Sequence, residues 1–109
     1  MGAPVQDILD AISEIHSFVG TLTFEEFRSD VKTIRAIGAD LVIIGEAASH
    51  IPDEVQAASS DVPWHLMRAM RNRIVHTYFD IDSSIVWEII QNDLPQIVEP
   101  LRKLGPGAD

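Results

Sequence analysis

The chain has 109 residues, 46% of them hydrophobic, and a formal net charge of -9. This length fits one compact domain and excludes two, and so small a core gains stability from association with a partner. The net negative charge is evidence against a protein that wraps nucleic acid, because such proteins bind phosphates through an excess of Lys and Arg. The absence of cysteine excludes disulfides and thiol nucleophiles and favours the cytoplasm. We expect no secretory signal and, because no apolar run reaches the roughly 20 residues that span a bilayer, no membrane association.

The first half of the sequence has the spacing of amphipathic helices. Apolar residues recur at three- and four-residue intervals over residues 5–19, and Gly20 follows as an end signal. Thr23 and Glu26 have the spacing of a capping box, and the same apolar period continues after them. The sequence predicts a helix before Gly20 and a second one over about residues 24–50.

Polar residues and a proline set the limits of this second helix. A break near Ser29 would divide it in two, with Asp30 capping the second piece. Pro52 closes the segment, because the residue before a proline is disfavoured in a helix. We expect a short helical turn over residues 52–58.

Two further helical segments are predicted in the second half. A central helix is expected from Pro63 to about Tyr78, and a last helical region from about Ser83. Pro95 lies inside the apolar stripe of that region and should kink or divide it. Residues 105–109 have the composition of a frayed, disordered tail.

The fold class that follows is all-α. No segment shows sustained two-residue alternation with β-branched enrichment, and no internal repeat is present. Four to five main helices joined by short loops most simply form an up-and-down bundle. We assign residues 1–104 to this one helical domain and expect it to dimerise.

The most informative stretch, residues 62–79, contains no Asp or Glu but three arginines and two histidines. It is a basic island in an acidic chain. Within it Arg71-Asn72, His76 and Tyr78 match, position for position, the HepT form of the HEPN motif. The segment 43–48 and the Ile51-Pro52 pair are similar to the flanking features of that family. The chain thus resembles the HepT-like toxins of the HEPN superfamily from about Val5 to Leu104.

The resemblance implies a metal-independent endoribonuclease, the toxin of a toxin–antitoxin pair. It implies that Arg71 and His76 act on the RNA substrate at a homodimer interface, without a cofactor. It also implies a partner, a nucleotidyltransferase antitoxin of the MntA type, which silences the toxin by transferring AMP to Tyr78. An AMP phosphate beside Arg71 would occupy the position of the substrate phosphate.

The chemistry explains why these residue types are useful together. RNA cleavage without a metal needs a proton removed from a ribose 2′-hydroxyl, a proton given to the leaving oxygen, and charge stabilised on the phosphorane. Histidine suits the two proton transfers because its ordinary pKa is about 6.5. Arginine suits the third task because its planar, permanently charged fork matches phosphate oxygens.

Helical geometry then predicts a site shared between subunits. If the central helix runs through Tyr78, Arg71 and His76 lie about 140° apart around it, at roughly 100° per residue. Asn72 and His76 would be stacked neighbours, and Tyr78 would lie about 20° from Arg71. Two such helices about a two-fold axis would bring one subunit's Arg71 to the other's His76, or would place all four groups around one shared cleft.

Less specific interpretations remain open at this point. Arg68 and Arg73 are expected to be electrostatic helpers, and Asn72 either orients His76 or is an ordinary exposed helix residue. The scattered histidines lack the spacing of a zinc site, so no metal is expected. The rival functions are a non-catalytic HEPN protein that binds RNA or nucleotide, and a structural partner of a nucleotidyltransferase.

Overall fold

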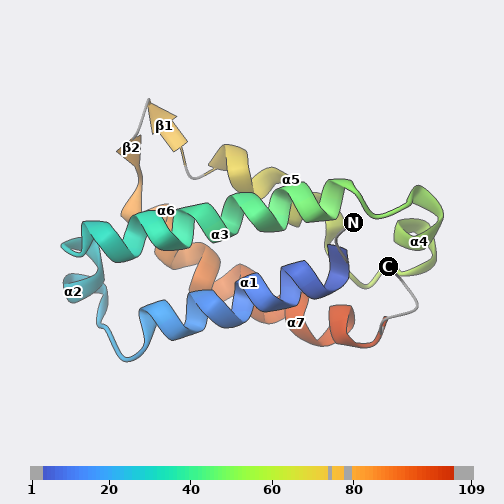
Figure 1. Ribbon diagram of the computed structural model, residues 1–109, viewed down its shortest axis with the longest axis horizontal. Helices are drawn as coiled ribbons and strands as arrows, with labels where there is room; N and C mark the ends of the chain where they lie inside the picture. The colour runs from blue at the N-terminus through green and yellow to red at the C-terminus, as the bar shows by residue number, and fades with distance from the viewer. Residues whose placement is uncertain (1–3, 74, 78–79, 105–109) are drawn as a thin grey trace.

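The computed structural model describes residues 4–73, 75–77 and 80–104. Within these ranges the chain forms an up-and-down bundle, in which successive long helices run in opposite directions (Figure 1). The all-α fold class and the bundle architecture are confirmed. The predicted tail at 105–109 lies outside the described residues.

The elements follow the predicted order, with one addition after the central helix. In chain order they are α1 (Pro4–Val19), α2 (Phe24–Arg28), α3 (Val31–Ser49), α4 (Asp53–Ala58), α5 (Trp64–Arg73), β1 (Val75–Thr77), β2 (Asp80–Ile81), α6 (Ser83–Glu88), the π-helical segment η1 (Ile89–Asp93) and α7 (Leu94–Arg102).

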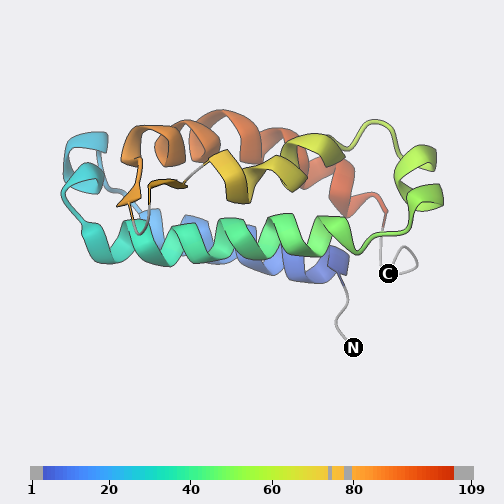
Figure 2. The ribbon, with the colours of Figure 1, turned by 90° about the horizontal axis from the view of Figure 1, so that it is seen from above.

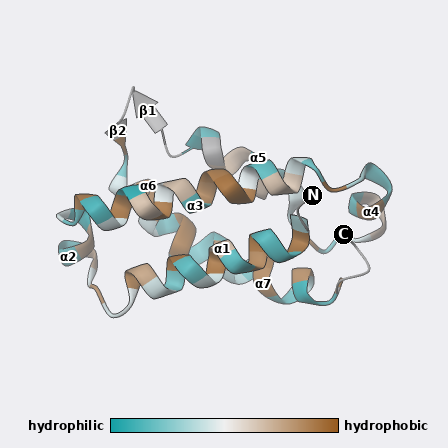
Figure 3. Cartoon of the chain, in the orientation of Figure 1, coloured by the Kyte–Doolittle hydropathy of each residue, from teal (hydrophilic) through white to brown (hydrophobic). Residues whose placement is uncertain are grey.

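The bundle has two layers with the core between them. α1 and α3 form one layer, and α5 with the α6–η1–α7 rod forms the other (Figure 2). Apolar bands recur along α1 and α3, as the predicted stripes require (Figure 3). The largest fully buried side chains come from both layers: Ile8, Ile15, Phe27, Ile37, Leu41, Ile44, Met67, Met70, Ile89, Leu94 and Ile97.

Local capping produces the corner between α1 and α3. Gly20 ends α1 at φ +52°, a conformation that L side chains rarely adopt. The predicted capping box is present, since Glu26 N–H donates to Thr23 and Thr23 N–H donates to the Glu26 carboxylate. Asp30 caps α3 by accepting from Thr33 N–H, and its hydrogen bonds with Thr33 lower the pKa of the Asp30 carboxyl. The break near Ser29 is therefore confirmed.

The C-terminal rod changes helical type just before Pro95. Leu94 N–H bonds the Ile89 carbonyl five residues back, which is the π pattern. α7 then starts at Leu94 with Pro95 in its first turn. Asp93 and Leu94 keep helical backbone angles, so the segment that Pro95 was predicted to kink or divide changes helical type just before Pro95 without a break in the backbone helix.

The predicted extent of the central helix was wrong. α5 ends at Arg73, and β1 pairs with β2 as a short antiparallel hairpin in which Val75 is opposite Ile81 and Thr77 is opposite Asp80. The run 74–77 holds three β-branched residues, which favour extended backbone over helix. Three strand residues are too few for the alternating pattern that sequence analysis relies on.

One carboxylate interrupts the buried face of α3. Asp40 is 3% exposed, and its Oδ2 has no hydrogen-bond partner in the described part of the chain. Burial, followed by the hydrogen bond and negative charge of Glu14 on α1, raises the pKa of Asp40 from 3.8 to about 6. None of the helices within the described ranges combines the length and hydrophobicity that a bilayer span requires.

The raised pKa of Asp40 predicts a pH-dependent stability. The Asp40 carboxyl binds its proton more tightly in the folded protein than in the unfolded chain, so the protonated form favours folding. This contribution to the free energy of unfolding is fully present below the unfolded pKa of 3.8 and is lost as the pH rises through about 6. Asp40→Asn removes this dependence. Between about pH 5 and pH 8, the unfolding free energy of the wild type should fall relative to Asp40→Asn by about 1 to 2 kcal/mol.

Urea denaturation across this pH range measures the difference. Asp53→Asn, a change at the start of α4, is the control and should follow the wild type. A constant difference between wild type and Asp40→Asn across the range would contradict the assignment.

Candidate active site

The motif residues lie where α5 ends and the hairpin begins. Arg71 and Asn72 belong to the last turn of α5, and Asn72 is exposed. His76 is the middle residue of β1. Tyr78 lies outside the described residues. The hairpin projects from the bundle beside α3 and the start of α6 (Figure 1).

This placement overturns the angular argument made from one continuous helix. Because Arg71 is helical and His76 is in a strand, neither the separation of about 140° nor the stacking of Asn72 on His76 applies. A strand rises about 3.3 Å per residue against about 1.5 Å in a helix. β1 therefore carries His76 away from α5 instead of turning it around the helix axis.

Arg73 fixes the end of α5 to the neighbouring α6–η1–α7 rod. Its Nη1 lies 2.6 Å from Oδ2 of Asp93 in η1, and both side chains are partly buried, at 34% and 14% exposed. Such a charge-assisted bond is stronger than a surface ion pair. The carboxylate also offsets the Arg73 charge, so this arginine contributes less positive potential than the sequence suggests.

Arg68 faces a different part of the molecule. Its guanidinium donates to the side-chain oxygen of Gln56 on α4, and the Gln56 amide donates to the carbonyl oxygen of Ile51 at 2.9 Å. Trp64 at the start of α5 is 6% exposed and donates from Nε1 to the Ser59 carbonyl at 3.0 Å. Trp64 is thus a packing anchor, as expected, and the N-terminal half of α5 holds α4 in place.

Sequence analysis missed the partners of these arginines. Asp93 and Gln56 are 20 and 12 residues from the groups that they bind. No pattern of neighbouring residues predicts contacts over such distances in the sequence. Asp40 did carry a signal, because it falls on the same helical face as Ile37, Leu41 and Ile44, where an acid is out of place.

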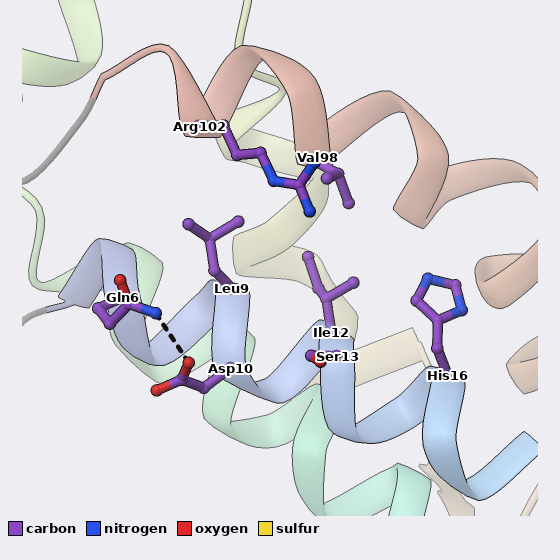
Figure 4. A pocket seen from close by; sticks show the side chains of 8 residues that line it. All are labelled: Gln6, Leu9, Asp10, Ile12, Ser13, His16, Val98 and Arg102. Atoms are coloured by element: carbon purple, nitrogen blue, oxygen red, sulfur yellow. Dashed lines mark hydrogen bonds between the residues drawn. The ribbon is translucent and has the colours of Figure 1, made fainter.

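No metal centre is formed by the part of the chain that the structure describes, where no three histidine or carboxylate groups are suitably clustered. A hollow of about 440 Å³ lies between α1 and α7, away from the motif. Figure 4 shows Arg102 extending from α7 beside Val98, across from Leu9 and Ile12, with His16 farther along α1. It is lined by Gln6, Leu9, Asp10, Ile12, Ser13, His16, Val98 and Arg102.

Comparison with known proteins decides the family. The model of the family described as Ribonuclease HepT-like matches residues 8–104, a span that includes the whole motif. The chain belongs to the HepT-like ribonuclease family. The resemblance inferred from the motif is therefore confirmed, and the enzyme class expected from it, an endoribonuclease, agrees with the family.

Several curated relatives of this HepT-like chain carry ribonuclease names. A protein of Thermococcus cleftensis described as a probable ribonuclease HepT is 35% identical over 100 residues, which cover 92% of this chain and 91% of the relative. A candidate RNase of Methanocaldococcus jannaschii is 34% identical over 98 residues, covering 90% and 81%. One from Caldanaerobacter subterraneus is 31% identical over 100 residues, covering 92% and 89%. No solved structure matches the chain significantly.

The ion pair between Arg73 and Asp93 predicts a measurable coupling in this HepT-like domain. Arg73→Met, Asp93→Asn and the double variant form a cycle in urea denaturation. We expect a coupling energy of about 1 kcal/mol or more, because a partly buried charge left unpaired is costly.

The exposed pair of Arg28 and Glu25, 3.3 Å apart, is the matched control. Its coupling should stay below about 0.5 kcal/mol, as for other surface pairs within one helix. Equal coupling in the two pairs would show that the Arg73 contact does not fix the end of α5.

Proposed function

We propose that the protein is a metal-independent endoribonuclease toxin in which Arg71 and His76 carry the chemistry. The observation that supports this most is the complete motif, Arg71-Asn72 followed by His76 and Tyr78, inside a chain that belongs to the HepT-like ribonuclease family. The described residues of the motif, Arg71, Asn72 and His76, lie at one junction, between α5 and the hairpin. Asn72, Arg68 and Arg73 are proposed as supporting residues.

The proposed reaction is an attack by a ribose 2′-hydroxyl on the adjacent phosphorus. The 2′-oxygen to phosphorus bond forms, the phosphorus to 5′-oxygen bond breaks, and one proton moves from the first oxygen to the second. Histidine imidazoles accept and return that proton near neutral pH. The Arg71 guanidinium stabilises the doubly charged phosphorane through two parallel hydrogen bonds.

We further propose that the site is completed by a second copy of the chain. A two-stranded hairpin is marginally stable in water by itself. β1 and β2 form a two-stranded sheet at the side of the bundle, where β2 contacts α3 and Ile81 packs against the core (Figure 1). Packing against the same element of a partner would stabilise both hairpins and bring the two motifs together. Arg71 of one subunit would then serve His76 of the other.

The regulation that we propose is covalent. A nucleotidyltransferase antitoxin would transfer AMP from ATP to the phenol oxygen of Tyr78, releasing pyrophosphate. The new phosphate would compete with the RNA backbone for Arg71. The lack of cysteine is consistent with action in the cytoplasm, where this partner and its ATP would be found.

One observation favours a non-catalytic rival, a domain that only binds RNA or nucleotide. Arg68 and Arg73 are both engaged within the chain, by Gln56 and Asp93, so fewer positive charges face a substrate in this acidic protein. Binding without cleavage in the assay below would support this rival.

The proposal predicts RNA cleavage that persists in EDTA and is lost in Arg71→Ala and in His76→Ala. Losing either proton transfer or charge stabilisation should reduce the rate by about a hundredfold or more. Gel analysis of a labelled oligoribonucleotide measures this, with His50→Ala, at the C-cap of α3, as a control. Cleavage that stops on chelation, or full activity in either variant, would refute the assignment of roles.

Mixing the two inactive variants tests the shared site in the same assay. If Arg71 and His76 come from different subunits, heterodimers should regain part of the activity. Failure to recover, once mass spectrometry has shown that subunits exchange, would favour a site within one chain.

Tyr78 should control activity without taking part in it. A phenol, with an ordinary pKa of about 10, transfers protons poorly at neutral pH. Tyr78→Phe should therefore keep most of the RNase activity and lose silencing by the nucleotidyltransferase, ATP and magnesium. Peptide mass spectrometry locates the AMP, and its attachment to another residue would remove Tyr78 from the mechanism.

A further inference from the structure

A second hollow, between α1 and α3, contains none of the motif residues. Its volume is about 340 Å³, and its lining is Asp7, Asp10, Ala11, Glu14, Asp40 and Ile43. The lining thus includes four carboxyl groups and no basic side chain. Asp7, Asp10 and Glu14 recur at three- and four-residue intervals along α1, so they share one exposed face of that helix. Asp40 meets them from α3.

Asp40 distinguishes this hollow from an ordinary acidic surface. The side chain is almost entirely buried, and its Oδ2 has no hydrogen-bond partner among the described residues. A hydrogen bond with Glu14 engages the Asp40 carboxyl group but brings a second negative charge next to it. A buried charge without a counter-ion is strongly destabilising. None of the described residues that line the hollow supplies a positive charge to this pair of acids.

The surroundings indicate what kind of cation would fit. Ile43, at the edge of the hollow, is 46% exposed, and the adjacent Val42 is 38% exposed. The described carboxylates are not clustered as a metal ion requires. A free small cation would gain nothing from the apolar edge, whereas a protein side chain with apolar neighbours would cover it.

We propose that the hollow between α1 and α3 is a docking site for a protein partner that inserts an arginine or lysine against Asp40 and covers Ile43 with an apolar side chain. The cation would donate hydrogen bonds to Asp40 and Glu14, and Asp7 and Asp10 would steer a basic partner toward the site. This surface is separate from the catalytic motif, and the inference does not depend on RNA cleavage.

Matched peptides test the proposal on the full chain. The probes are the acetylated peptide amides Leu-Arg-Ile-Leu and Leu-Cit-Ile-Leu, in which citrulline is a neutral isostere of arginine. ¹H–¹⁵N correlation spectra at neutral pH should show saturable shifts within residues 7–14 and 40–43 for the arginine peptide. Its dissociation constant should be about tenfold lower than that of the citrulline peptide, since charge pairing supplies the difference.

Substitutions then locate the charge. Asp40→Asn should raise the dissociation constant of the arginine peptide by about tenfold, and Glu14→Gln, at an exposed residue, should raise it by a smaller factor. Asp53→Asn, outside the hollow, should change nothing. If Asp40→Asn fails to fold, Glu14→Gln carries the test, because its side chain lies on the surface.

Four outcomes would overturn the proposal. Equal dissociation constants for the two peptides would show that the site does not recognise a positive charge. Shifts confined to other helices would show that the peptide does not bind in this hollow. Ethylguanidinium binding as tightly as the arginine peptide would show a site for a small cation. A change in sedimentation between wild type and Asp40→Asn would show that the occupant is a second copy of this chain.

Discussion

The helix α3 is buried from two sides, and the rest of the molecule is arranged around it. It packs against α1 within its own layer and against α5 in the other layer. Such a helix needs apolar or small residues over more than one face. α3 meets this demand with Ile37, Leu41 and Ile44 and with the buried glycines Gly38 and Gly45. Losing the contact with α5 would free the helix whose last turn carries Arg71 and Asn72.

The parts of the fold that were predictable are those fixed by neighbouring residues. The caps at Thr23 and Asp30 each satisfy a backbone N–H three positions away, so the residue spacing that predicts each cap is also the spacing of its hydrogen bond. The hairpin was missed for the opposite reason. The helical period through Met67 and Met70 favours continuation beyond Arg73, and only the β-branched residues that follow argue against it.

The candidate site also has one part that was predictable from neighbouring residues and one part that was not. The order of Arg71, Asn72, His76 and Tyr78 was sufficient to identify the family, because a motif is a property of the sequence itself. The spatial relation of Arg71 to His76 was not predictable, since it depends on where α5 ends. The ion pair between Arg73 and Asp93 depends on how α5 packs against η1, and no residue pattern within either helix predicts it.

The pairing of Arg73 with Asp93 has a topological effect. Residues 20 positions apart are joined at 2.6 Å, so the whole hairpin is enclosed in a loop whose base is closed by the ion pair. The entropy of closing a loop grows only slowly with its length. A longer or shorter loop would therefore change the cost of closure only slightly, so the ion pair can hold the end of α5 and η1 in register without fixing the conformation of the hairpin between them.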